Sequence, residues 1–119
     1  MKNHFDLELR TFQFTKDVSF LIKRLPKNII NFNFSKQLIR SASAIGANYI
    51  EANEPLGRKD LIMRMRIARK EAKESTYWLK LILETNDPSD PECNKLFNEA
   101  MELKLILSKI IENLNKTHI

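Results

Sequence analysis

The chain has 119 residues, of which 43% are hydrophobic and 29% charged, with two glycines and one cysteine. This length suits one domain with its own core, and so little glycine leaves few tight turns for a β-sheet. One cysteine excludes an intramolecular disulfide, and no stretch approaches the ~20 apolar residues that cross a bilayer. The opening residues lack the apolar core of a secretory signal. We therefore expect a single all-α domain over residues 1–119, located in the cytoplasm and without a membrane contact.

Apolar residues at helical spacing predict four helices in chain order, over residues 6–25, 35–53, 59–85 and 91–116. The first stops at Pro26, and the second is expected to begin with Ser35 as its N-cap. Asp90 is expected to cap the fourth, with Pro91 at the first helical position, where a missing N–H costs nothing. Helices of ~18–27 residues joined by short connections favour an antiparallel up-and-down four-helix bundle.

Each predicted helix has one apolar stripe that should face the core. The third is the most regular, because its stripe advances by alternating steps of three and four residues, as in coiled coils. The inward residues are expected to be Leu7, Phe14, Val18, Leu21, Ile22 and Leu25; Leu38, Ala42, Ile45 and Tyr49; Leu61, Met65, Ala68, Ala72, Ser75, Leu79 and Ile82; and Leu96, Leu103, Leu107, Ile110 and Leu114.

The second predicted helix is thin, because small residues fill the stretch from Ser41 to Ala47. Close approach of a neighbouring helix is the favoured interpretation, ahead of a ligand groove. Asn48 and Glu51 are expected to join an interhelical polar network that fixes register. Cys93 is interpreted as a buried structural thiol in preference to a reactive one.

A second apolar stripe lies away from the predicted core side on the first and third helices. Isolated apolar side chains are ordinary on a surface, but aligned aromatic residues on several helices indicate an interface. We expect self-association through the following residues: Phe5, Leu9, Phe12, Phe20, Met63, Ile67, Trp78 and Leu81.

Positive charge is concentrated in the third segment of a chain whose net charge is +5. Lys59, Arg66, Lys70, Lys73 and Lys80 fall within one band of the helical wheel. Such a band can follow phosphates through charge alone, with binding that weakens as salt rises. The alternative is an ordinary solvated face on which Lys70 and Lys73 pair with neighbouring glutamates.

Catalytic chemistry has few candidates in this sequence. His4 and His118 lie near the termini, and the two glycines are too isolated to form a phosphate loop. A bundle enzyme would depend on the spacing of Glu51 and Glu54, although glutamates at i,i+3 on a helix usually face water. We predict no catalytic residue, no metal and no cofactor.

The second and third segments carry a long motif that extends from Gln37 to Ala52 and from Ile67 to Leu79. It reads Gln-x-x-Arg, then Asn-x-x-Glu, then Lys-Glu-Ala-x-Glu-x-x-Tyr-Trp-Leu. With the opening Phe5-Asp6-Leu7 and the total length, this pattern resembles the family of four-helix-bundle proteins encoded in intervening sequences of 23S ribosomal RNA genes.

The resemblance implies an antiparallel bundle assembled as a ring-shaped homopentamer, with no established enzymatic activity. It also implies an accessory role, since relatives in diversity-generating retroelements bind a reverse transcriptase and nucleic acid. Charge and wheel position then select the candidate polyanion contacts: Arg40, Lys59, Arg66, Arg69, Lys70 and Lys73.

Two functions follow from these patterns. The leading hypothesis is a ring-forming accessory protein that binds structured RNA or an RNA–protein complex with little sequence specificity. The alternative is a protein–protein scaffold, with Trp78 and Phe12 in its docking patches and a basic stripe that only aids solubility.

Overall fold

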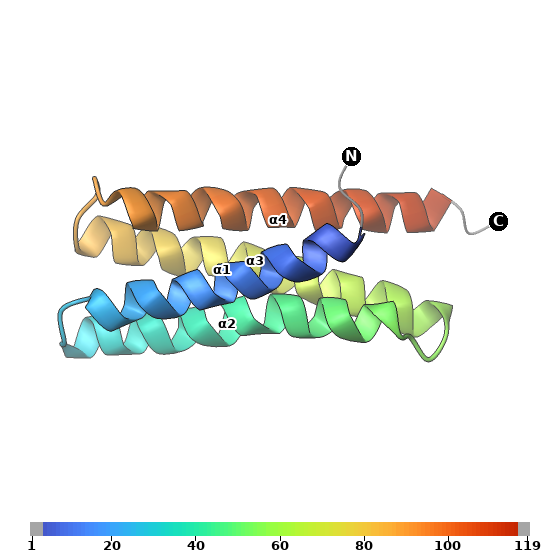
Figure 1. The fold of residues 1–119 in the computed structure, drawn as a ribbon, viewed down its shortest axis with the longest axis horizontal. Helices are drawn as coiled ribbons and strands as arrows, with labels where there is room; N and C mark the ends of the chain where they lie inside the picture. The colour runs from blue at the N-terminus through green and yellow to red at the C-terminus, as the bar shows by residue number, and fades with distance from the viewer. Residues whose placement is uncertain (1–3, 117–119) are drawn as a thin grey trace.

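The structure is a computed structural model that describes the backbone of residues 4–116 and the side chains of residues 7–116. It contains α1 (His4–Arg24), α2 (Ile29–Asn53), α3 (Arg58–Thr85) and α4 (Pro91–Lys116), with no strand in the described range. The four helices alternate in direction along one long axis (Figure 1). The predicted all-α four-helix architecture is therefore confirmed.

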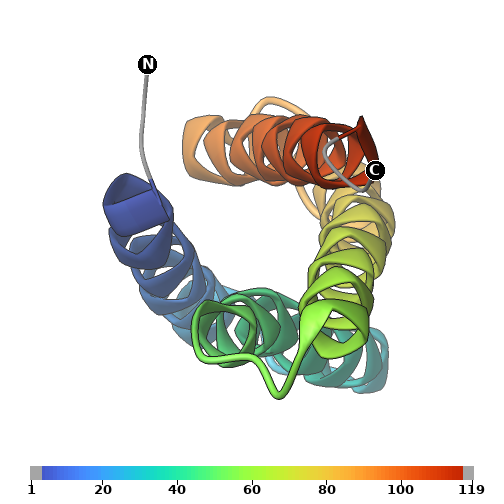
Figure 2. The ribbon, with the colours of Figure 1, turned by 90° about the vertical axis from the view of Figure 1, so that its right-hand side faces the viewer.

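Each helix packs against its neighbours in chain order, and α1 returns to α4 to close the bundle. Within residues 4–116 the backbones of the diagonal pairs, α1 with α3 and α2 with α4, do not approach each other closely. Seen end-on, the N-terminal end of α1 diverges from α4 (Figure 2). The bundle is thus least closed along the edge between its first and last helices.

Helix α2 begins at Ile29, so the predicted start at Ser35 is wrong. Asn28 is the N-cap, because its backbone is extended and its side chain accepts a hydrogen bond from the Asn31 N–H at 2.8 Å. The apolar pattern did not predict the first turn of α2, because its apolar residues Ile29 and Phe32 are exposed and do not continue the inward stripe. Ser35 instead lies buried inside the helix.

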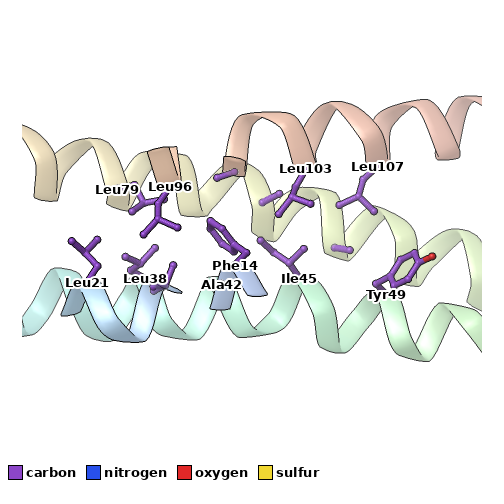
Figure 3. Close-up of a cluster of buried hydrophobic side chains, with 14 of the residues drawn as sticks. Phe14, Leu21, Leu38, Ala42, Ile45, Tyr49, Leu79, Leu96, Leu103 and Leu107 are labelled. Carbon is purple, nitrogen blue, oxygen red and sulfur yellow. The ribbon is translucent and has the colours of Figure 1, made fainter. Parts of the chain in front are cut away.

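The core contains most of the predicted inward residues (Figure 3). Phe14, Leu38 and Ile45 fill its middle beside leucines of α3 and α4. Ile110 is the main exception, since it is only half-buried and Ile111 takes the buried position. Three other predicted inward residues pack at the margin of the core without full burial: Ile22, Leu61 and Leu114.

Small residues let α2 approach both of its neighbours closely, as predicted. On the α1 side, a Cβ built on Gly46 would lie 3.0 Å from Thr11 Oγ1, and Thr15 donates a hydrogen bond to the Ala42 carbonyl at 3.1 Å. On the α3 side, the hydroxyls of Ser41 and Ser75 form a buried hydrogen bond of 2.8 Å. The thin stretch of α2 is therefore occupied by helix packing.

Ion pairs at two levels connect α1 to α4. Arg10 binds Glu99 at 2.7 Å and Glu102 at 3.1 Å, and Arg24 binds Asp90 at 2.9 Å. Asp90 also accepts the Glu92 N–H at 3.0 Å, which confirms its predicted capping position. Polar side chains therefore hold the edge that apolar packing closes least.

Cys93 is buried at the α3–α4 contact, where its thiol donates to the Leu79 carbonyl at 3.7 Å. Burial raises the pKa of the Cys93 thiol to about 11, and the nearby Asp90 carboxylate acts in the same direction. The interpretation of Cys93 as a buried thiol is confirmed.

Substitution of Gly46 by valine tests the close α1–α2 approach. We expect Gly46→Val to lower the free energy of unfolding by about 2 kcal/mol, because the added carbons displace Thr11 from a packed position. Urea unfolding followed by circular dichroism measures the change. Ala47→Val is the matched control, since Ala47 is exposed on the same turn. Equal losses in the two variants would contradict close packing at Gly46.

Candidate nucleic-acid interface

One side of α3 faces away from the bundle, because α2 and α4 flank the helix and Ala68 and Ala72 face the core (Figure 2). A period of 3.6 residues places on this side a set of cations with interspersed apolar side chains. We call it the outer face of α3, and it comprises Lys59, Met63, Arg66, Lys70, Lys73, Tyr77, Lys80 and Leu81.

Four of the six predicted polyanion contacts are exposed on the outer face: Lys59, Arg66, Lys70 and Lys73. Arg69 is half-buried at the edge of this face toward α4. Arg40 lies apart from it, because it belongs to α2 and points to the α2–α3 seam. The structure therefore brings most, but not all, of the predicted set together.

Most exposed cations of the outer face lack an ion-pair partner among the side chains that the structure describes, and Lys70 lies near Glu74 without bonding to it. Lys59, Arg66, Lys73 and Lys80 form no ion pair with any residue whose side chain the structure describes. Glu74, the expected partner of Lys70 and Lys73, is bound by Arg40 instead. Positive charge on the outer face is thus not cancelled by ion pairing.

Arg40 neutralises two glutamates at the α2–α3 seam. Its guanidinium lies 3.3 Å from Glu71 and bonds to Glu74, which also accepts from Trp78 Nε1 at 3.0 Å. The Trp78 hydrogen bond, followed by Arg40 and Lys70, lowers the pKa of Glu74. The hydrogen bond with Glu74 raises the pKa of Arg40. Arg40 therefore connects α2 to α3 through ion pairs, unlike the cations of the outer face.

Two solvent-open hollows lie along the outer face and share Lys70. In the first, Lys70, Lys73 and Lys80 surround Tyr77, Leu81 and Phe97, the last contributed by α4. The second is lined by a shorter set: Lys59, Ile62, Met63, Arg66, Ile67 and Lys70. Cations therefore rim an apolar floor along much of α3.

The residues predicted for self-association divide between two surfaces. Leu9, Phe12 and Phe20 are exposed on α1, with Phe12 68% exposed, whereas the side chain of Phe5 lies outside the described residues. Met63, Ile67 and Leu81 instead lie among the cations of the α3 hollows. The outer face of α3 thus combines residues predicted to bind a polyanion with residues predicted to bind a second copy of the chain.

Trp78 has a place within its own bundle. Its ring is half-buried, lies 6.0 Å from the Phe34 ring between centroids, and meets Tyr77 edge-on at 4.9 Å. Trp78 therefore has contacts within its own chain that were not predicted, supplied by Phe34 of α2 and Glu74, and its place in a self-association surface stays a prediction. The sequence concealed this because Phe34 precedes the predicted start of the second helix.

Sequence reasoning missed Tyr77 as a candidate, although it is 60% exposed at the centre of the first hollow. A signal was present, because Tyr77 lies opposite the core seam with Lys73 and Lys80 a turn away on either side. Ile29 and Phe32 were also missed as exposed apolar residues of α2.

The acidic pairs considered for catalysis lie on the surface. Glu51 and Glu54 are exposed near the end of α2, and Glu51 takes no part in the polar contact that joins Asn48 to Arg64 at 3.2 Å. Among the described residues, no group of three or more His, Cys, Asp or Glu side chains could hold a metal ion. No helix in residues 4–116 is long and apolar enough to cross a membrane.

These features define a four-helix bundle whose third helix presents a basic outer face. Over residues 5–109 the sequence matches the family described as 23S rRNA-intervening sequence protein, and the chain belongs to that family. The fold is similar to the crystal structure of a protein of unknown function from the S23 ribosomal protein family of Bacteroides thetaiotaomicron VPI-5482. The two are 32% identical, with a TM-score of 0.82 over 92% of this chain and 97% of that one. A comparison with curated proteins finds no match.

Trp78 is the one tryptophan of the chain, so its fluorescence reports directly on Glu74. We expect its emission to titrate with a midpoint below the ordinary Glu value of 4.5, because hydrogen bonds lower the pKa of Glu74. The ionised Glu74 carboxylate contributes fully to stability at a pH above its ordinary pKa, and this contribution is lost as the pH falls through the lowered pKa of the folded protein. Glu74→Gln should abolish the transition, and Glu84→Gln should leave it intact. A transition that survives Glu74→Gln would contradict the assignment.

Proposed function

We propose that this protein is a non-catalytic nucleic-acid-binding accessory protein that contacts structured RNA or a ribonucleoprotein through the outer face of α3. The observation that carries the proposal is the set of cations on this face without an ion-pair partner in the described bundle. Exposed lysine and arginine side chains bind phosphates and release counterions, which favours RNA without reading its sequence.

The local charge distribution supports this choice of surface. Arg40 pairs with Glu71 and Glu74 on the α2 side of α3, so those carboxylates are neutralised close to the outer face. The exposed cations recur at intervals of one or two helical turns, from Lys59 to Lys80. A flexible polyanion along α3 would therefore meet successive positive charges.

Self-association is the second part of the proposal, with a homopentameric ring as the assembly that the family resemblance implies. Leu9, Phe12 and Phe20 on α1 and Ile50 on α2 are each more than half exposed, on helices that do not carry the cations of α3, and we take them as the self-association surface. Burial of this surface between subunits would leave the outer face of α3 open. Repeated basic faces in one assembly would then bind a long RNA with avidity.

A protein–protein scaffold is the alternative function. Exposed apolar residues of α1 and α2 favour it, because Phe12 and Phe32 are more than half exposed. A reverse transcriptase or another protein could bind there, while the outer face of α3 contributes only solubility. The two functions differ in whether the cations of α3 are needed for partner binding.

Charge reversal on α3 tests the nucleic-acid proposal. We expect Arg66→Glu/Lys70→Glu/Lys73→Glu to weaken binding of a labelled structured RNA at least tenfold at low salt, because three phosphate contacts are replaced by repulsion. Fluorescence anisotropy at about 50 and 200 mM salt measures the affinity and its salt dependence. Binding by the unaltered protein should fall steeply over this range.

A matched control keeps the same net charge change. Lys16→Glu/Lys36→Glu/Lys95→Glu reverses three exposed cations away from the outer face of α3, and circular dichroism checks that both variants keep their helices. Equal RNA affinities of the two variants would contradict the assignment of the outer face of α3 as the RNA-binding site. Absence of RNA binding by the unaltered protein at both salt concentrations would favour the scaffold.

Polar substitutions on α1 test the self-association surface. We expect Leu9→Asp/Phe12→Asp to shift the protein toward monomer in sedimentation velocity, because charged groups on an apolar interface must be desolvated on assembly. Gln13→Asp is the control, since Gln13 is exposed on the same helix. The unfolding free energy should change little because both targets are exposed. An unaltered mass in the double variant would exclude this surface as the interface.

A further inference from the structure

The hollow around Tyr77 combines an apolar floor, which a purely electrostatic phosphate track does not need, with the cations that such a track requires. Its floor consists of Tyr77, Leu81 and Phe97, its volume is about 730 Å³, and three lysines stand at its rim. A duplex presents phosphates outward and keeps its bases stacked inside, so an aromatic floor adds nothing to duplex binding. Unpaired bases, by contrast, stack on exposed aromatic rings between basic side chains.

Tyr77 is held in place as a platform. Its ring meets Trp78 edge-on at 4.9 Å, and Trp78 is itself fixed by Glu74 and by packing near Phe34. Tyr77 nevertheless remains 60% exposed, so the ring is supported from inside and open toward solvent. The edge-on contact with Trp78 restricts the rotamers of Tyr77, which lowers the entropy cost when a planar ligand stacks on its exposed face.

The charges of the hollow match a nucleic-acid strand. Lys70, Lys73 and Lys80 are exposed, and of the two glutamates in the lining, Glu74 is already bound by Arg40 and Trp78. Glu84 is exposed one turn beyond Lys80, so three lysines face one unneutralised carboxylate. The second hollow continues from Lys70 and adds Lys59 and Arg66 without an acidic residue in its lining. The strand therefore has a continuous positive path from the platform along α3.

We propose that the Tyr77 hollow binds an unpaired segment of nucleic acid, with a base stacked on Tyr77 and flanking phosphates on Lys70, Lys73 and Lys80. The inference deepens the proposed function and rests on it. Unpaired loops or bulges, and not the helical stems, are then the parts of a structured RNA that this protein recognises. No sequence preference is required, because every base offers a face for stacking.

The test compares two RNA probes of one sequence, a single strand of about 12 nucleotides without self-complementarity and its blunt duplex. Anisotropy titrations at one low salt concentration use the full chain and two variants, Tyr77→Ser and Tyr77→Phe. We expect Tyr77→Ser to lose about tenfold in affinity for the single strand and to keep its affinity for the duplex, because a ring but no charge is removed. Tyr77→Phe should bind the single strand as the unaltered protein does.

Trp78 supplies an independent readout, since its ring contacts Tyr77. The single strand should change Trp78 emission in the unaltered protein and in Tyr77→Phe, with a smaller change for the duplex. Far-ultraviolet circular dichroism confirms that Tyr77→Ser remains folded.

The outcomes separate this inference from the function on which it rests. RNA binding with equal affinity for both probes, unaltered by Tyr77→Ser, would overturn the base platform and leave phosphate binding by α3 in place. Equal weakening of both probes by Tyr77→Ser would also overturn the platform. Failure of the unaltered protein to bind either probe would overturn both proposals and direct the search to an acidic protein partner.

Discussion

The close approach of α2 to both neighbours is the constraint on which the rest of this bundle depends. Gly46 leaves room for Thr11, and the hydroxyls of Ser41 and Ser75 meet in the interior, so α1 and α3 pack against a helix with little bulk of its own. Larger side chains at these positions would push the outer helices away from the shared core. The large side chains Phe14 of α1 and Leu79 of α3 fill the core beside the small residues of α2. Other large side chains of α1 and α3, such as Phe12 and Tyr77, are exposed on the outside of the bundle and are accessible to partners.

Charge in this protein is divided by location. Cations at the seams are paired, as with Arg10 beside Glu99 and Arg40 beside Glu71 and Glu74, whereas those on the outer face of α3 have no such acidic partner in the described bundle. Pairs at the seams orient helices and contribute modestly to stability. Cations that do not serve the fold remain available for a ligand. The total charge alone could not reveal this division, because Arg40 and Lys70 count equally in it.

Helical periodicity predicted the architecture and most of the core, because apolar residues such as Leu38, Ile45 and Leu103 recur on one face of each predicted helix, and that face is the buried one. It failed at the start of α2, where Asn28 caps a first turn whose apolar residues face outward. That error hid Phe34, so the packing of Trp78 near Phe34 within the chain was not predicted. The basic face was readable from residue spacing. Which cation pairs with which glutamate was not, because pairing depends on the relative rotation of α2 and α3.

The ion pairs that connect α1 to α4 predict which part of the bundle opens first. Arg10 and Arg24 form ion pairs with Glu99 and Asp90 across an edge from which the N-terminal end of α1 diverges (Figure 2). Apolar residues of α1 also lie in the core that all four helices share. Ion pairs near a surface weaken with salt, but buried apolar contacts do not. Amide protons of α1 should therefore exchange through a local opening that salt promotes, while those of α3 wait for global unfolding. Salt is therefore expected to weaken one edge of the bundle and to leave the apolar core that all four helices share.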